Sequence, residues 1–230
     1  MTGKKKYIWF DLGYTLLKLK REKLFQDMLE VLGFSVSINK IEKAFHLTDK
    51  LFMRMYPGTL GKKRSFYMPI YMGNMIYNLG IRTDICPLYE TWRQKLDNPY
   101  KVWVPFYNVK NELKNLVSEG YSLGVISNWD KTALPLLDQF KLTSFFDNII
   151  ISSEVGCEKP DLKIFQFALD QASVSPEDCL YVGDNYYDDG IGSRKIGMDF
   201  VLVNPFGILG IEELKDCNIV PDISYIREFL

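Results

Sequence analysis

Short, largely apolar blocks recur along the chain, with segments of helical spacing between them. The blocks are Tyr7 to Phe10, Leu123 to Ile126, Asn148 to Ile151, Leu180 to Val182 and Phe200 to Val203. Continuous apolar runs of this length are typical of strands that are buried on both faces of a parallel sheet. Because helical segments such as 107–119 and 161–172 separate the later blocks, the pattern predicts an α/β fold with right-handed crossovers.

The chain that follows the first block is predicted to be helical from about residue 18 to residue 99. Apolar residues recur there at helical spacing, and Gly33 and Pro57-Gly58 mark breaks. Helices are predicted over residues 17–34, 39–55, 65–79 and 87–96. We therefore expect an α/β core domain, residues 1–17 and 100–230, interrupted by an all-helical domain, residues 18–99.

Polar residues stand where three of the apolar blocks end. They are Asp11, Ser127, Asn128 and Asp184. In open α/β sheets the ligand crevice lies outside the carboxyl ends of the strands, so these side chains are expected to face one crevice. Gly13 allows the chain to turn tightly after Asp11, and the Thr15 hydroxyl can hold that turn.

The carboxylates among these residues point to a metal site. Asp11 and Asp184, with Asp188 or Asp189 one turn later, bring two or three carboxylates to adjacent strand ends. Like charges held that close repel one another, so a cation is expected among them. Oxygen ligands without His or Cys select a hard ion, and magnesium, Mg²⁺, is the first choice.

The remaining polar residues match the needs of phosphoryl transfer. An aspartate such as Asp11 can attack phosphorus and form an acyl phosphate. Ser127 and the backbone amides near Asn128 can donate hydrogen bonds to phosphoryl oxygens. Lys159 precedes Pro160 at a predicted helix start and can set a positive charge against the charge that develops on those oxygens.

In this order the residues resemble the four-motif signature of the haloacid dehalogenase-like (HAD) hydrolase superfamily, over about 4–18 and 101–206 of the sequence. The resemblance implies a Rossmann-like, doubly wound parallel sheet with a helical cap domain inserted after the first motif. It implies Asp11 as nucleophile and Ser127 and Lys159 as the phosphate-binding pair. The metal ligands that it implies are Asp11, the backbone carbonyl of Gly13, Asp184 and Asp189.

One position departs from the family pattern. Gly13 stands where family phosphatases have the aspartate that protonates the leaving alcohol and then activates water. General acid and base help of that kind is worth roughly 10²- to 10⁴-fold. The adjacent Tyr14 is a poor base and needs an unusual orientation to replace it. The help must therefore come from elsewhere, or the substrate must need little of it.

Three functions remain open at this point. The first is a Mg²⁺-dependent phosphatase of a small phosphorylated metabolite, for which the intact motif around Asp184 speaks. The second is a 2-haloacid dehalogenase or phosphonatase, because relatives of those types also lack the second aspartate; Lys62 or Lys63 would be the phosphonatase lysine. The third is a non-catalytic module that binds a phosphorylated ligand or a protein.

Composition narrows the class of protein. Of the 230 residues 47% are hydrophobic and 25% charged, as in globular proteins, and no apolar run has the length of a membrane span. We expect a cytoplasmic monomer or homodimer that binds neither nucleic acid nor membrane. The four cysteines are far apart, which argues against zinc, and the single histidine, His46, is expected at a helix surface or cap rather than in catalysis.

Charge is distributed unevenly between the two predicted domains. Residues 18–99 contain 14 basic and 8 acidic residues, a net charge of +6, and the remainder contains 14 and 21, a net charge of −7. A basic insert beside an acidic, metal-binding core favours an anionic substrate. The candidates in the insert for contact with the rest of the substrate are Arg54, Lys62, Lys63, Arg64, Tyr67, Tyr71 and Tyr77.

Overall fold

The computed structural model describes residues 5–95 and 102–230, which divide into two compact units. The first, here called the α/β unit, comprises the chain up to Lys18 with Val104–Ile208 and Glu212–Leu230. The second, the helical unit, comprises Leu19–Trp103 and Leu209–Ile211. Among the helices that the structure describes, none combines the length and apolar character needed to cross a membrane.

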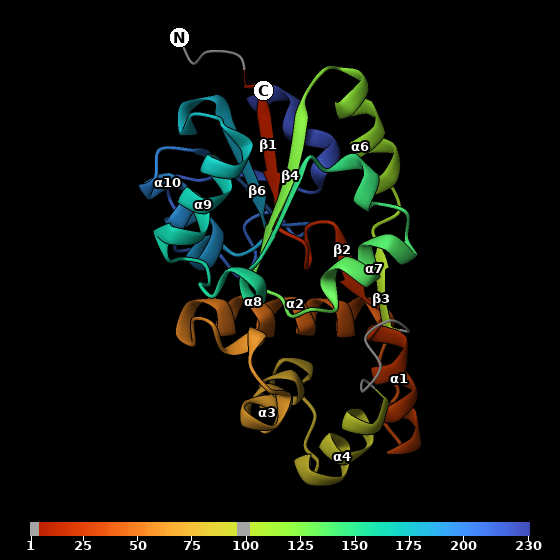
Figure 1. The fold of residues 1–230 in the computed structure, drawn as a ribbon. Helices are drawn as coiled ribbons and strands as arrows, with labels where there is room; N and C mark the ends of the chain where they lie inside the picture. The colour runs from red at the N-terminus through yellow and green to blue at the C-terminus, as the bar shows by residue number, and fades with distance from the viewer. Residues whose placement is uncertain (1–4, 96–101) are drawn as a thin grey trace. The chain divides into compact units, whose positions relative to one another are not determined.

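A six-stranded parallel sheet forms the centre of the α/β unit (Figure 1). Its strands, in spatial order, are β5 (Asn148–Ile151), β4 (Ser122–Ser127), β1 (Tyr7–Phe10), β6 (Cys179–Gly183), β7 (Asp199–Val203) and β8 (Asn218–Val220). The register sets Phe10 beside Val125 on one side and Val182 on the other. The side chains of β1 are all buried, as its unbroken apolar sequence requires.

Helices cover both faces of this sheet, so it is doubly wound. The helices of the unit are α6 (Val109–Ser118), α7 (Ala133–Gln139), α8 (Ser152–Val155), α9 (Leu162–Ala172) and α10 (Ile191–Lys195), with the 3₁₀ helices η3 (Thr143–Phe145), η4 (Pro176–Asp178) and η6 (Ile223–Phe229). Figure 1 shows α9 and α10 on one side of the sheet and α6 on the other. The predicted fold class, an α/β Rossmann-like sheet, is confirmed.

Three short strands differ from the prediction. β2 (Leu17–Leu19) lies where a helix was predicted, and it pairs with β3 (Trp103–Pro105) in a second, two-stranded sheet. The helical prediction was wrong at its start because the Leu-Lys-Leu alternation suits a strand with one buried face. β3 and β8 were not predicted, since each has three residues and gives too short an apolar signal.

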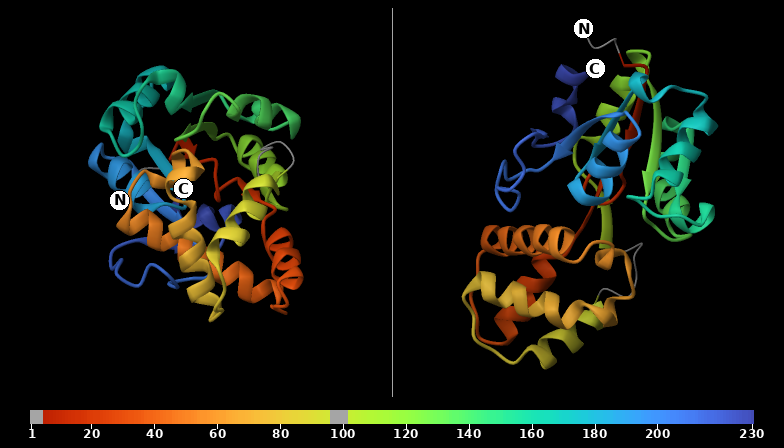
Figure 2. Two further views of the ribbon diagram at one scale, coloured as in Figure 1. Left: turned by 90° about the horizontal axis from the view of Figure 1, so that it is seen from below. Right: turned by 90° about the vertical axis from the view of Figure 1, so that its left-hand side faces the viewer.

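The helical unit contains no strand apart from the ends of β2 and β3 in its described residues. Its helices are α1 (Glu22–Val31), α2 (Ile38–Met55), α3 (Met68–Leu79) and α4 (Ile85–Lys95), with the 3₁₀ turns η1 (Thr59–Gly61) and η2 (Arg64–Phe66). The predicted end of the last helix at Leu96, and of the insert at residue 99, lies outside the described residues. Figure 2 shows these helices from two further sides.

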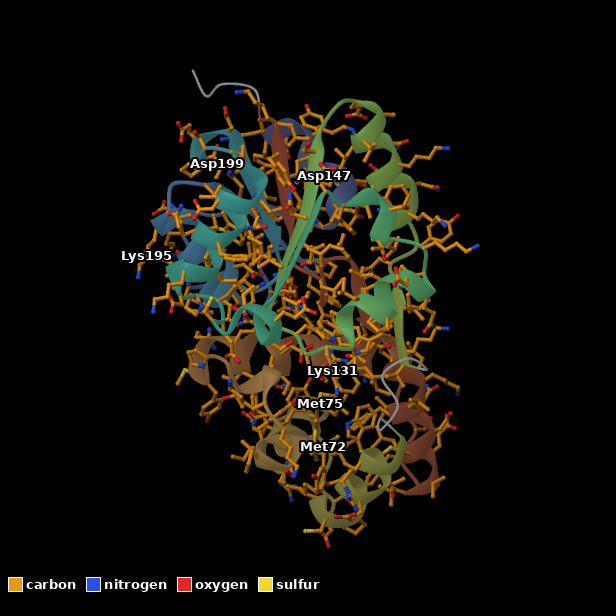
Figure 3. All side chains as sticks on the ribbon, in the orientation of Figure 1. Met72, Met75, Lys131, Asp147, Lys195 and Asp199 are labelled. Carbon is orange, nitrogen blue, oxygen red and sulfur yellow. The ribbon has the colours of Figure 1, made fainter. Side chains whose placement is uncertain are left out.

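Aromatic and methionine side chains form the core of the helical unit. Phe25, Phe45 and Trp92 meet edge to face or tilted, with ring centroids 5.3–5.7 Å apart. Met72 and Met75, labelled in Figure 3, are fully buried on α3. Apolar stripes on amphipathic helices thus meet as the sequence spacing predicts.

Candidate active site

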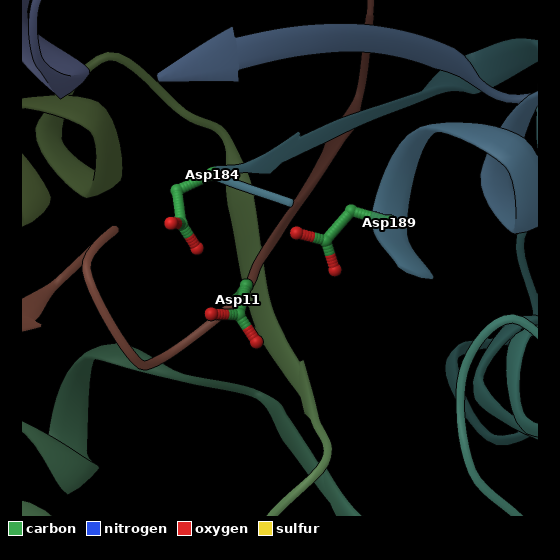
Figure 4. A group of neighbouring side chains, drawn as sticks. All are labelled: Asp11, Asp184 and Asp189. Carbon is green, nitrogen blue, oxygen red and sulfur yellow. The ribbon is translucent and has the colours of Figure 1, made fainter. Parts of the chain in front are cut away.

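Three carboxylates meet at the carboxyl edge of the sheet. Asp11 follows β1, Asp184 follows β6, and Asp189 lies in the π-helical turn η5 (Tyr186–Gly190). One oxygen from each lies within 4.8 Å of the others, and all three side chains are buried. Figure 4 shows them directed toward one another. The group therefore forms a single acidic site.

The pairing of β1 with β6 places the first two of these residues. The Asp11 amide donates to the Val182 carbonyl at 2.9 Å, which continues the ladder one step beyond β1. Asp184 is the residue after β6, so both side chains leave the same edge of the sheet. This arrangement puts the ends of neighbouring parallel strands on one crevice.

Asn185 brings the third carboxylate back to the site. Its side-chain Oδ1 accepts hydrogen bonds from the amides of Tyr187, at 3.1 Å, and Asp188, at 3.4 Å, and so caps the η5 turn. Its backbone amide donates to Asp189 Oδ2 at 3.0 Å. A π-helical turn is rare and frequently marks a functional site.

The Asp189 carboxylate packs directly against Gly183, in space that a side chain at this position would fill. A Cβ atom on Gly183 would lie 2.2 Å from Asp189 Oδ2 and 2.5 Å from its Cγ. Real Cβ contacts are never that short, and Asp189 is buried, so the carboxylate would have to move. Glycine is therefore required at the end of β6 by the position of the acid.

Lys159 lies beside the carboxylates with its ammonium fully engaged. Its Nζ donates to Asp11 Oδ1 and Asp189 Oδ1, each at 2.6 Å, and to the phenol oxygen of Tyr181 at 3.0 Å. Burial alone lowers the pKa of this lysine, but the charges of Asp11 and Asp189 outweigh it and hold the pKa well above the usual value. Lys159 is thus a cation at any physiological pH.

Ser127 is the last residue of β4 and lies next to Asp11, and Asn128 follows it. The Ser127 hydroxyl donates to Asp11 Oδ1 at 3.1 Å. Asn128 engages the backbone of Lys159 twice, donating from Nδ2 to its carbonyl at 2.9 Å and accepting at Oδ1 from its amide at 2.7 Å. The four predicted motif residues Asp11, Ser127, Lys159 and Asp184 are therefore brought together, although their chemical roles stay predictions.

The donor set suits a hard divalent cation. Three carboxylates against one ammonium give the ionised cluster a net charge of −2, and every donor is oxygen. Both hydrogen bonds that described side chains make to the Asp11 carboxylate end on Oδ1, which leaves Oδ2 for a further partner. Burial, partly offset by the charge of Lys159, raises the pKa of Asp189 to about 6. A bound cation would offset the free-energy cost of burying the ionised carboxylate.

Comparison with known proteins identifies the family. A family model described as haloacid dehalogenase-like hydrolase matches residues 8–203. The chain belongs to this family of hydrolases. Glyceraldehyde 3-phosphate phosphatase from Methanothermobacter thermautotrophicus is 35% identical over 141 residues, a region that covers 55% of this chain and 58% of that enzyme.

Two further likenesses extend over nearly the whole chain. Haloacid dehalogenase-like hydrolase domain-containing protein 3 from Mus musculus is 31% identical over 228 residues, which cover 94% of this chain and 90% of the mouse protein. The crystal structure of the HAD-hydrolase YfnB from Bacillus subtilis, solved with bound magnesium, superposes with a TM-score of 0.66 at 18% identity, over 99% of both chains. At that identity the structure shows that this hydrolase has the same fold.

Some predicted residues of the hydrolase are placed differently from expectation. Thr15 Oγ1 is buried and makes no hydrogen bond to any residue that the structure describes, so its predicted role in holding the turn was wrong. The turn is closed instead by the backbone, with the Tyr14 amide donating to the Leu17 carbonyl at 2.6 Å. The Gly13 carbonyl stays a predicted metal ligand. His46 is buried within α2, with Nε2 2.9 Å from the Leu209 carbonyl, so the expected helix surface or cap was wrong.

The candidate substrate residues of the helical unit fall into two groups. Tyr67 and Tyr71 are buried, with their rings 6.1 and 5.2 Å from that of Phe52, and so they belong to the core of that unit rather than to a stacking surface. Tyr71 also donates to Asp49 at 2.5 Å, beside Arg21. The exposed or partly exposed candidates are Arg54, Lys62, Lys63 and Tyr77. The side chain of Arg64 lies outside what the structure describes.

Two residues of the site were not foreseen. Tyr181 lies inside an apolar block and would normally be counted as core, although its hydroxyl reaches Lys159. Asn185 was passed over between two aspartates, although an asparagine before a turn is a recognisable capping signal. Asp188, the alternative third carboxylate, lies beside the cluster and outside it. Burial and the charge of Asp189 raise its pKa to about 7.

Proposed function

We propose that this chain is a magnesium-dependent phosphatase that acts on a small phosphorylated metabolite through an aspartyl-phosphate at Asp11. The observation that carries the proposal is the position of Asp11. One of its carboxylate oxygens is held by Ser127 and Lys159, and its side chain also belongs to the acidic cluster. The proposed nucleophile, the proposed phosphate-binding pair and the proposed metal ligands thus meet at Asp11.

The reaction has two displacements. A carboxylate oxygen of Asp11 forms a bond to phosphorus while the ester oxygen leaves with the bonding electron pair. Water then attacks the phosphorus of the acyl phosphate, which releases inorganic phosphate and returns the carboxylate. When the phosphoryl group enters, Ser127 and Lys159 each exchange a hydrogen bond to Asp11 for one to the oxygens on which negative charge develops, and the bond from Lys159 is charge-assisted.

The metal would be held by Asp11, Asp184 and Asp189, with the Gly13 carbonyl as a further ligand. Bound there, a divalent cation supplies positive charge that screens the incoming phosphate from the carboxylates. The same acidic set favours a phosphatase over a dehalogenase, because displacement of a halide requires no metal and gains nothing from Asp184 and Asp189 so close to the nucleophile.

Gly13 determines which esters this site hydrolyses well. Without a carboxylic acid at that position the leaving oxygen departs unprotonated, so substrates with acidic leaving groups, such as aryl phosphates, are expected to react faster than alkyl phosphates. The test compares phosphate release from p-nitrophenyl phosphate and from glycerol phosphate, with Mg²⁺, for the wild type and for Gly13→Asp.

Gly13→Asp is expected to raise kcat/KM for the alkyl ester by roughly 10²- to 10⁴-fold and to change the aryl ester far less, since only the former needs the added acid. Asp11→Asn, which removes the nucleophile, is the control and should abolish both activities. Release of phosphate no faster than from Asp11→Asn, with either ester, would contradict the proposed function. Chloride release from a 2-chloro acid would then favour the dehalogenase.

A further inference from the structure

We propose that Tyr181 and Asn128 are positioning residues that clamp Lys159, the first at its ammonium and the second at its backbone. The inference rests on the phosphatase function proposed above and concerns how the phosphate-binding lysine is kept in place. Neither side chain is required to touch the phosphoryl group. Both act through Lys159, which is buried and reaches the site from the segment after α8.

The phenol of Tyr181 supplies the third acceptor that the ammonium needs. An ammonium has three N–H donors, and those of Lys159 reach Asp11, Asp189 and Tyr181. The single phenol proton is committed elsewhere, because Tyr181 donates to the Ile126 carbonyl at 2.8 Å. A lone pair of its oxygen is therefore left to face Lys159, while the more distant Asp189 Oδ1, at 3.3 Å, is a weaker second acceptor for the proton.

The amide of Asn128 fixes the other end of the lysine. It donates to the Lys159 carbonyl and accepts from the Lys159 amide, so both of its functional atoms are used by one backbone unit. Paired bonds of this kind define position and orientation together. The predicted contact of substrate with the backbone amides near Asn128 stays a prediction, and the Asn128 side chain is used by the backbone of Lys159.

Tyr181 and Asn128 are both tied to the segment 126–128: Tyr181 donates to the Ile126 carbonyl, and Asn128 belongs to the segment. Ile126 and Asn128 flank Ser127 at the end of β4. The segment that helps to position Lys159 therefore also carries Ser127, the other proposed hydrogen-bond donor to the phosphoryl group. The separation of the Ser127 hydroxyl from the Lys159 ammonium is thereby set by one short stretch of backbone. A change in this distance is expected to weaken stabilisation of the transition state more than it lowers the free energy of unfolding.

The chain offers a matched control for each residue. Tyr7 is buried on β1, donates from its phenol to another carbonyl of β4, that of Leu123, at 3.2 Å, and accepts from Asn148 Nδ2 at 2.9 Å. Tyr7→Phe and Asn148→Leu thus remove the same chemical groups from the same strand neighbourhood without touching Lys159. They control for the structural cost of losing such hydrogen bonds.

The experiment measures kcat and KM for p-nitrophenyl phosphate with Mg²⁺, together with calorimetric binding of orthovanadate, which mimics a phosphoryl group in transfer. Tyr181→Phe and Asn128→Leu are each expected to lower kcat by roughly 10- to 100-fold with little change in KM, and to weaken orthovanadate binding, because a misplaced lysine loses contact with the transition state. Tyr7→Phe and Asn148→Leu should leave both quantities unchanged. Should Tyr181→Phe not fold, Asn128→Leu carries the test in the same assays.

A double-mutant cycle separates positioning from a purely structural role. In a Lys159→Met background the substitution of Tyr181 or Asn128 should cause no further loss of orthovanadate binding, since the residue through which they act is gone. Losses that add, or equal losses in the Tyr7 and Asn148 controls, would overturn the proposal. A wild type that neither hydrolyses the ester nor binds orthovanadate would instead refute the phosphatase function, and the clamp would fall with it.

Discussion

At the scale of single residues, the site depends most closely on Gly183, whose lack of a side chain leaves space for the Asp189 carboxylate. Asp189 has its carboxylate where a Cβ atom of Gly183 would be, and its Oδ2 accepts from the Asn185 amide. A buried acid with one permitted position is a good metal ligand because little entropy is lost when a cation binds. We therefore expect metal affinity at the proposed site to depend on a glycine, although glycine has no side chain that could be a ligand.

Gly183→Ala should weaken Mg²⁺ binding by roughly 10- to 100-fold, as changes behind a metal ligand commonly do. The reason is that the new methyl group must displace the Asp189 carboxylate. Isothermal titration with Mg²⁺ measures the effect. Gly61→Ala is the control, since its Cβ meets nothing within 4 Å. An affinity equal to that of the control would show that Asp189 is not a ligand.

At the scale of elements, the parallel neighbours β1 and β4 pack tightly where Trp9 pairs with Gly124. Trp9 is fully buried, stacks on Tyr7 with ring centroids 4.5 Å apart, and covers Gly124 on the neighbouring strand. A Cβ on Gly124 would lie 2.3 Å from the indole. A glycine in a central strand normally weakens it, but here it admits a fully buried tryptophan.

Gly124→Ala should therefore destabilise the protein by about 1–3 kcal/mol, the usual cost of overpacking a core. Urea unfolding followed by far-ultraviolet circular dichroism measures it. Trp9→Phe, combined with Gly124→Ala, should recover part of the loss because the smaller ring leaves room for the methyl group. Losses that simply add in the double variant would mean that the two side chains do not compete for the same space.

The elements that sequence reasoning found are those with a strong local signal. β1, β4 and β6 are apolar blocks, and the polar residues at their ends led directly to Asp11, Ser127 and Asp184. β2, β3 and β8 were missed because three residues provide little periodicity and their pairing is decided by partners distant in sequence. The local sequence pattern is enough to predict a buried strand, whereas a short edge strand forms only because of its tertiary contacts.

Contacts between distant segments were also beyond prediction inside the site. Lys159 was predicted from its place between two strand ends, but its contact with Tyr181 depends on which strands become neighbours. The order β4-β1-β6 sets side by side three strands that are not consecutive in sequence, and only that order aligns Tyr181 with Ile126. Side chains that support others are therefore less predictable than those to which the proposal assigns the chemistry.

At the scale of the whole molecule, the candidate metal site forms only when distant parts of the chain fold together. Asp11 and Asp189 are separated by most of the α/β unit in sequence, yet their carboxylates share Lys159. An unfolded chain cannot hold a cation between them. Any ion that binds the assembled site must therefore stabilise the folded state by mass action.

Mg²⁺ at a concentration 100-fold above its dissociation constant is expected to add about 2.7 kcal/mol to the free energy of unfolding. For a chain of this size that corresponds to a rise in Tm of roughly 5–10 °C. Differential scanning calorimetry with EDTA and with Mg²⁺ measures the shift. Asp184→Asn removes one carboxylate and should abolish it, whereas Asp147→Asn, at an exposed aspartate remote from the cluster and labelled in Figure 3, should preserve it. A Tm that does not respond to Mg²⁺ in the wild type, or an undiminished response in Asp184→Asn, would show that the three carboxylates do not hold the cation.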